Sequence, residues 1–183
     1  MSLLQTGIAK SSAADAYTID NSLRFNTGDS PYLSRTPTVA GNRRTWTASL
    51  WSKRSVLAGD QMLLEAITGS NEFYLRWGDA GTVLNIYSAV DSPNDNVLKT
   101  TALYRDPSAW YHIVLAVDTT QATPADRVKL YVNGDQITSF SHTDYPAQDT
   151  QWQVNNSVAH TIGSYKGTSM YYDGYLAEFY LID

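Results

Sequence analysis

Two polar segments near the C-terminal end of the chain concentrate aromatic side chains among amide and charged groups. They are SHTDYPAQDTQWQVNN (residues 141–156) and SYKGTSMYYDG (residues 164–174). An aromatic ring stacks on the apolar face of a sugar, while amides and charged groups hydrogen-bond to its hydroxyls. The residues expected to bind such a ligand are Tyr145, Trp152, Asn156, Tyr165, Lys166, Tyr171 and Tyr172. The alternative left open is that these rings seal loop ends or build subunit contacts.

The carboxylates do not have the spacing that glycoside hydrolysis requires. That reaction needs two carboxyl groups flanking the scissile bond, about 5–5.5 Å apart for retention and about 6.5–9.5 Å for inversion. Glu65 and Glu72 fall in separate predicted strands, and Asp173 and Glu178 would face opposite sides of one strand. We therefore expect a domain that is not an enzyme.

Calcium is the one cofactor that the sequence leaves open, because this ion takes roughly six to eight oxygen ligands. The segment DSPNDN (residues 91–96) supplies Asp91 and Asp95 but lacks the glycine and distal glutamate of an EF-hand loop. Asp118 and Asp173 are the other candidates. An ordinary polar turn is the alternative interpretation of the segment.

The three histidines are expected to have structural roles. His112 and His160 fall within predicted strands, where a histidine packed on a sheet face and hydrogen-bonded is the ordinary arrangement. His142 stands in a polar segment and is expected to be solvated. The sequence shows no arrangement of histidine with serine and aspartate, or with a second histidine, that argues for catalysis or metal binding.

The elements that must position these groups are β-strands. Apolar residues alternate with polar ones in TWTASLW (residues 45–51), EFYLRW (72–77) and RVKLYV (127–132), as in half-buried antiparallel strands. The short segment DQMLLEAI (60–67) is assigned as a strand because its neighbours are strands. Roughly ten to twelve strands with turns about every 8–12 residues predict an all-β antiparallel β-sandwich or jelly roll.

The turns agree with that interpretation. Asn133 and Gly134 supply the two positive φ angles of a type I′ turn, which predicts a hairpin between VKLYV (128–132) and DQITSF (135–140). GDAG (78–81) is expected to join two strands in the same manner.

Composition limits the partners. The formal net charge is -5 and no basic cluster stands out, which argues against nucleic acid. Cysteine is absent, so the chain has no disulfide and no thiolate ligand. We expect no signal peptide and no membrane insertion. One domain, residues 21–183, is expected after an N-terminal arm, residues 1–20, that either frays or docks on a partner.

Four stretches in series resemble laminin-G-like jelly rolls of the concanavalin A-like lectin/glucanase superfamily, in order and spacing, from about residue 20 to the end. They are SLRFN, TWTASLWSKR, the pair AWYHIVLAVDTT and DRVKLYVNGDQI, and IGSYKGTSMYYDGYLAEFYLID. Parts of them resemble laminin-G-like domains in tail and other virion proteins of bacteriophages.

The resemblance implies a concanavalin A-like antiparallel β-sandwich, which is the fold expected here. It implies a non-enzymatic bacteriophage virion module, exposed on tail or capsid at the surface of the phage particle, that binds host-surface carbohydrate. The alternative is a structural decoration protein that makes protein–protein contacts in the virion. The expected partners are a host-surface glycan, other virion proteins reached through the arm, and further copies of the chain in a homo-oligomer.

Overall fold

The computed structural model describes residues 17–79, 81–90 and 96–183. Within these ranges the structure is built from strands, with two short 3₁₀ helices, η1 (Thr27–Asp29) and η2 (Pro124–Asp126). No helix in the described part of the chain is long and apolar enough to cross a membrane. Of the arm expected over residues 1–20, only residues 17–20 fall in the described part.

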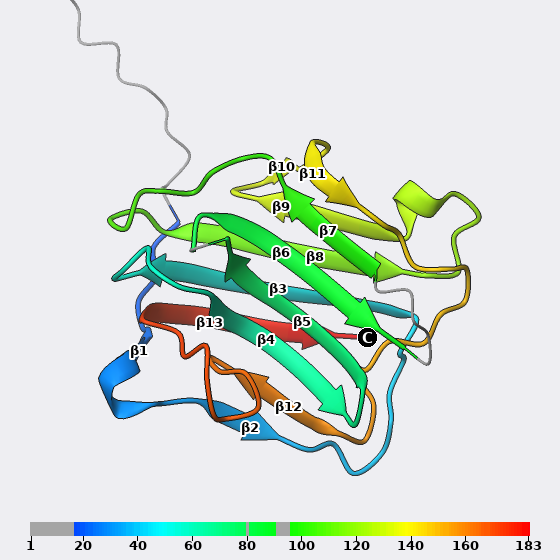
Figure 1. Ribbon diagram of the computed structural model, residues 1–183, viewed down its shortest axis with the longest axis horizontal. Coiled ribbons are helices and arrows are strands. Elements are labelled where there is room, and N and C mark those ends of the chain that lie inside the picture. Colours follow the sequence, from blue (N-terminus) through cyan, green and yellow to red (C-terminus); the bar gives the residue numbers. More distant parts are fainter. Residues whose placement is uncertain (1–16, 80, 91–95) are drawn as a thin grey trace, which may run out of the picture.

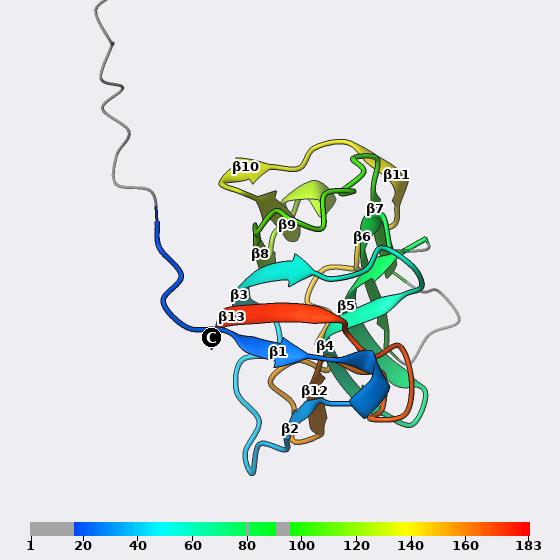
Figure 2. The same ribbon diagram turned by 90° about the vertical axis from the view of Figure 1, so that its left-hand side faces the viewer.

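The strands form two antiparallel sheets that pack face to face as a sandwich. The six-stranded sheet has the order β1 (Leu23–Phe25), β13 (Gly174–Ile182), β3 (Thr45–Arg54), β8 (Tyr111–Asp118), β9 (Val128–Val132) and β10 (Asp135–Gln136). The seven-stranded sheet has the order β11 (Phe140–Thr143), β7 (Asn96–Thr100), β6 (Val83–Ala89), β5 (Asn71–Gly78), β4 (Gln61–Thr68), β12 (Ala159–Ile162) and β2 (Leu33–Arg35). Figure 1 shows the seven-stranded sheet in front, and Figure 2 shows the two layers from the side.

The alternation in the sequence produces the two faces of each sheet. In β3, Trp46, Ala48 and Leu50 are buried between the sheets, while the residues between them face outward. The segment DQMLLEAI forms β4, as predicted. The expected turn GDAG joins β5 to β6, which pair as antiparallel strands, although Ala80 of this turn lies outside the described residues. The expected antiparallel β-sandwich is confirmed.

The hairpin after β9 is confirmed only in part. Asn133 and Gly134 have φ angles of 54° and 90°, as a type I′ turn requires. The strand expected over residues 135–140, however, pairs with β9 for two residues only and then joins the other sheet as β11. The chain changes sheets here so that both Ile137 and Phe140 pack against the core between them.

One irregularity in β13 matters for the surface. Ala177 is opposite Trp51 and Tyr180 is opposite Ser49, so β13 holds one extra residue in a bulge. Glu178 lies in this bulge with a φ of 48°, in the left-handed region. The bulge turns Phe179 and Leu181 toward the core and Tyr180 toward solvent.

Candidate functional site

The outer face of the seven-stranded sheet carries a row of aromatic and charged side chains, which we call the tyrosine face. Tyr74 of β5 and Tyr87 of β6 are cross-strand partners, with parallel rings whose centroids are 4.7 Å apart. The guanidinium of Arg76 lies over the Tyr74 ring, 4.8 Å from its centroid. Glu72 precedes Tyr74 on the same side of β5 because side chains two apart share a face. All four side chains are partly exposed.

The loop between β12 and β13 packs onto this face over β4. Its backbone is fixed by Glu65, a buried side chain of β4 whose Oε2 accepts hydrogen bonds from the Lys166 N–H and the Thr161 hydroxyl, both at 2.7 Å. The Tyr165 hydroxyl donates to Glu72 Oε2 at 2.9 Å. The loop therefore places Tyr165 and Lys166 beside Glu72, at one end of the row.

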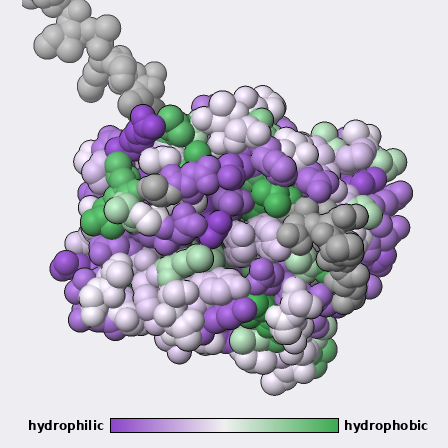
Figure 3. Space-filling model, in the orientation of Figure 1, coloured by the Kyte–Doolittle hydropathy of each residue, from purple (hydrophilic) through white to green (hydrophobic). Residues whose placement is uncertain are grey.

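The charges on this face are paired. Arg76 forms an ion pair with Asp60 at 2.8 Å, and the Lys166 ammonium lies 4.7 Å from the centroid of the Tyr165 ring. Burial raises the pKa of Tyr74 to about 12, so its hydroxyl keeps its proton at neutral pH. Figure 3 shows this side of the molecule, where a hydrophilic band crosses a mixed surface. The face therefore combines ring surface with donors and acceptors that are already held in place.

Four of the seven predicted ligand-binding residues lie in this loop, and three of them, Tyr165, Lys166 and Tyr171, are at least partly exposed. The Tyr171 hydroxyl donates to the Gly167 carbonyl at 2.7 Å, so that side chain braces the loop. Tyr165 and Lys166 face the row on the sheet.

Trp152 and Tyr172 are not surface platforms, and their predicted stacking role is wrong. Trp152 is fully buried, and its ring packs against Trp46 and Phe73 with centroids 5.8 and 5.4 Å away. Tyr172 is also fully buried, with its hydroxyl 2.8 Å from the Ser52 hydroxyl. A ring without an accessible face cannot stack on a ligand, so these two residues belong to the core.

Tyr145 and Asn156 lie away from the tyrosine-face loop, and Figure 1 shows the segment that follows β11 at the opposite end of the sandwich. Tyr145 is half-buried and packs against the core. The Asn156 side chain donates to Gln153 Oε1 at 2.9 Å and accepts from the Ser157 N–H at 2.9 Å, which stabilises its own turn. The structure thus separates the two loops that the sequence grouped.

The acidic candidates for calcium differ in their surroundings. Asp91 and Asp95 lie outside the described residues. Asp118 accepts from the Thr120 N–H and hydroxyl and from the Gln121 side chain, and these hydrogen bonds hold its carboxyl pKa below the usual value. Asp173 follows Tyr172 at the end of its loop. Over residues 17–79, 81–90 and 96–183, no three histidine or acidic side chains cluster as a metal site would require.

The structure changes the interpretation of one carboxylate pair, Glu65 and Glu72. β4 and β5 are neighbours, and Glu65 is opposite Tyr74, which shares a face of β5 with Glu72. Glu65 is sealed beneath the loop, where burial raises its carboxyl pKa above the usual value. Glu72 is bonded to Tyr165. One member of the pair is therefore closed to a substrate.

The two strand histidines have the structural roles expected of them. The His112 ring stacks on Trp51 and lies 3.0 Å from the Ser49 hydroxyl. His160 is buried, accepts from the Asn155 N–H at 3.1 Å, and has its pKa lowered chiefly by burial. His142 is exposed on β11.

The sequence carried a signal for the tyrosine face that the candidate set did not include. Alternation in EFYLRW already placed Tyr74 and Arg76 on the outward side of their strand. Tyr87 could not be matched to them from the sequence alone, because a cross-strand pair depends on the register between β5 and β6.

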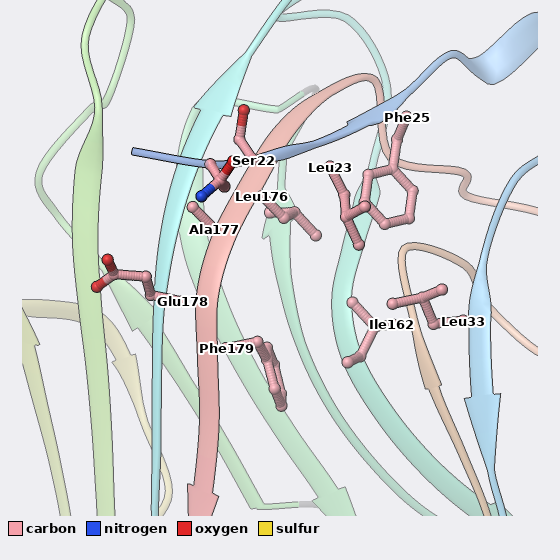
Figure 4. Close-up of a pocket in the computed structure, with 10 residues that line it drawn as sticks. Ser22, Leu23, Phe25, Leu33, Ile162, Leu176, Ala177, Glu178 and Phe179 are labelled. Carbon is pink, nitrogen blue, oxygen red and sulfur yellow. The ribbon is translucent and has the colours of Figure 1, made fainter. Parts of the chain in front are cut away.

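Two cavities lie on another side of the sandwich. An apolar cavity of about 360 Å³ opens between the two sheets on the side of β1 and β2, lined by Leu23, Leu33, Ile162 and Phe179 among others (Figure 4). A second, of about 540 Å³, continues past His160. Neither cavity is lined by residues of the loop or of the row on the tyrosine face.

The two-sheet antiparallel sandwich defines the fold class of this domain as a β-sandwich of the jelly-roll kind. The chain matches the family model described as the concanavalin A-like lectin/glucanases superfamily over residues 26–183, and it belongs to that family. A search of curated proteins found no significant match.

Solved structures with the same fold are distant in sequence. One is the CBM40 module of the Ruminococcus gnavus IT-sialidase (18% identity, TM-score 0.57, covering 76% of each chain). Another is the LG4-5 pair of the mouse laminin alpha1 chain (12%, TM-score 0.58, 89% of this chain and 41% of that one). A third is tailspike protein 2 of the Escherichia coli O157:H7 bacteriophage CAB120 (15%, TM-score 0.58, 87% and 22%).

Proposed function

We propose that this domain is a non-enzymatic carbohydrate-binding module and that the tyrosine face is its binding surface. The observation that carries the proposal is the meeting of Tyr165 and Lys166 with the row of Glu72, Tyr74 and Arg76 on one exposed sheet face. Ring surface and fixed hydrogen-bonding groups side by side are what sugar recognition requires.

The geometry of the face favours binding without large rearrangement. Glu65 anchors the loop through the backbone of Lys166, and Asp60 fixes the Arg76 guanidinium. Groups that are held before the ligand arrives lose little conformational entropy on binding. Hydrolysis is not part of the proposal, because Glu65 is buried and the Asp60 carboxylate is held in an ion pair with Arg76.

The ligands bound by several structural neighbours support a glycan as the ligand here. The Ruminococcus gnavus module is described bound to alpha2,3 and to alpha2,6 sialyllactose, and a domain of a Geobacillus stearothermophilus arabinanase in complex with arabinotriose. The tailspike similarity supports the finer proposal, which is that the module is exposed on the tail or capsid of a bacteriophage particle and binds host-surface carbohydrate.

A glycan array probed with the full chain, with and without calcium, tests the proposal. A defined set of hits is expected, and the double variant Tyr165→Ala/Lys166→Ala should weaken them at least tenfold. Tyr145→Ala is the matched control, because that ring lies in the other loop. A blank array from folded protein, or hits that the double variant leaves unchanged, would contradict the proposal. Loss of hits on chelation would implicate calcium ligands such as Asp118 or Asp173.

The apolar side of the sandwich favours a second candidate function, a decoration protein that assembles through protein contacts. Leu23, Leu33 and Val39 are each between 46% and 78% exposed around the two cavities. Exposed aliphatic groups that gather in this way are typical of interaction surfaces. Native mass spectrometry distinguishes the two, since a stable trimer or higher oligomer favours assembly and a monomer counts against it.

A further inference from the structure

The outer face of the six-stranded sheet, opposite the tyrosine face, carries a separate aromatic stack. Trp51 of β3 stacks with two rings on the outer face of the six-stranded sheet. The His112 centroid is 4.7 Å from that of Trp51, and the Tyr17 centroid is 5.4 Å from it, with a plane inclined by only 2°. Ser49 holds His112 through a 3.0 Å hydrogen bond. Trp51 is thus an indole supported by His112 and covered by the stacked ring of Tyr17.

Tyr17 is held lightly. Its side chain is 62% exposed, and it is fixed by the stack on Trp51 and by a hydrogen bond from its hydroxyl to the carboxylate of Glu178. Both hydrogen-bonding groups are exposed to solvent, so water competes for each of them. A ring in this position can be displaced by a ligand that makes the same two contacts.

Glu178 is placed beside Trp51 by the bulge of β13. Glu178 has a φ of 48°. A residue other than glycine adopts such an angle only at a cost in conformational energy, and it persists where the surrounding structure enforces it. Figure 4 shows its carboxylate turned away from the apolar cavity that Leu176 and Phe179 line. The bulge therefore brings the Glu178 carboxylate to the hydroxyl of the Tyr17 ring that stacks on Trp51.

We infer that Trp51 and Glu178 form a second carbohydrate subsite, on the face opposite the tyrosine face, and that Tyr17 is its displaceable cap. Tyr17 presents an apolar ring face to the indole and a hydroxyl donor to the carboxylate. A pyranose presents the same pair, an apolar C–H face and a hydroxyl donor. The negative charge of Glu178 disfavours acidic sugars, so the ligand class is a neutral hexose within a polysaccharide.

The full chain and its Tyr17→Ala variant, titrated with soluble dextran, mannan and β-1,3-glucan, provide the test. Removal of the cap should tighten binding to at least one of the three about fivefold, which corresponds to about 1 kcal/mol. Tyr17→Phe, which keeps the stack and loses the hydrogen bond, should fall between the two. Equal or weaker binding of Tyr17→Ala to all three polysaccharides would overturn the inference.

Second substitutions in the Tyr17→Ala background locate the subsite. Trp51→Ala should abolish the gain, and Glu178→Gln, which keeps the size of the side chain, should reduce it at least threefold. Leu103→Ala, at another exposed position, should leave it unchanged. A gain that survives both Trp51→Ala and Glu178→Gln would overturn the inference.

The inference and the proposed function fail separately. Tyr165→Ala/Lys166→Ala in the Tyr17→Ala background should keep the gain while losing the array hits. Loss of the gain in that variant would assign the binding to the tyrosine face and overturn the second subsite. If the array hits persist but Tyr17→Ala shows no gain in polysaccharide affinity, the proposed function stands and the second subsite is overturned.

Discussion

The carboxylate of Glu65 accepts a hydrogen bond from the backbone N–H of Lys166 at 2.7 Å, across 101 positions of the sequence. Through this contact a buried residue of β4 fixes the loop that completes the tyrosine face. The other carboxylate oxygen, Oε1, is buried without a hydrogen-bond partner in the described part of the chain. Glu65 therefore both holds the loop and carries a desolvation cost.

That cost predicts a pH-dependent stability. Burial raises the carboxyl pKa of Glu65 in the folded state, so the folded protein holds this proton more tightly than the unfolded chain. The contribution of Glu65 to stability is then complete below its ordinary pKa and is lost as pH rises through its raised value. In Glu65→Gln this loss is absent. The melting temperature of Glu65→Gln relative to wild type should therefore rise as pH increases from the ordinary to the raised pKa of Glu65. Parallel pH profiles of the two melting temperatures would contradict this prediction.

Replacement of Trp152 by alanine should destabilise the domain by about 3–5 kcal/mol, because a fully buried ring stacked on Phe73 would leave a cavity. Trp152→Phe should cost far less, since the indole N–H has no hydrogen-bond partner in the described structure. Urea titrations of both variants measure the difference. If Trp152→Ala kept wild-type stability, the assignment of this ring to the core would be wrong.

Arg54 offers a test of a buried cation. Its guanidinium lies 4.1 Å from the centroid of the Trp77 ring and donates to the Tyr104 carbonyl, while Nε and Nη1 have no partner in the described residues. A methionine keeps the packing without the desolvated charge, so Arg54→Met should stay within about 1 kcal/mol of wild type or exceed it. Arg54→Ala should lose about 3 kcal/mol through the cavity alone. Chemical denaturation of Arg54→Met and Arg54→Ala measures the two stabilities. Equal losses in the two variants would contradict this interpretation of the buried cation.

Two glycines with positive φ should respond differently to alanine. Gly134, with a φ of 90°, has no other atom within 4 Å of the place that a Cβ would take, so Gly134→Ala should cost only the backbone strain, about 1–2 kcal/mol. At Gly174, with a φ of 150°, a Cβ would collide with the Lys53 carbonyl oxygen. Gly174→Ala should therefore destabilise the domain more than Gly134→Ala in thermal melts, and the reverse order would refute the register of β13 against β3.

The sequence was sufficient to predict the β-sandwich but not to predict the tyrosine face. Alternation in TWTASLWSKR fixes the faces of β3, because side-chain direction in a strand depends only on local geometry. Trp152 is buried in a polar segment that crosses the end of the core, where its backbone N–H donates to the Arg43 carbonyl at 3.2 Å. Contacts of this range are set by tertiary packing, and no local pattern encodes them.

The position of β13 has a consequence for how the protein folds. The last nine-residue strand pairs with β3 along most of its length and with β1, which lies near the other end of the chain. Until β13 has left the ribosome, β3 has an unpaired edge and the six-stranded sheet is incomplete. Folding governed by pairings of such long sequence separation is slow, on the order of milliseconds to seconds. We expect the domain to fold only once β13 is available, with the exposed edge of β3 as the point most prone to aggregation during that delay.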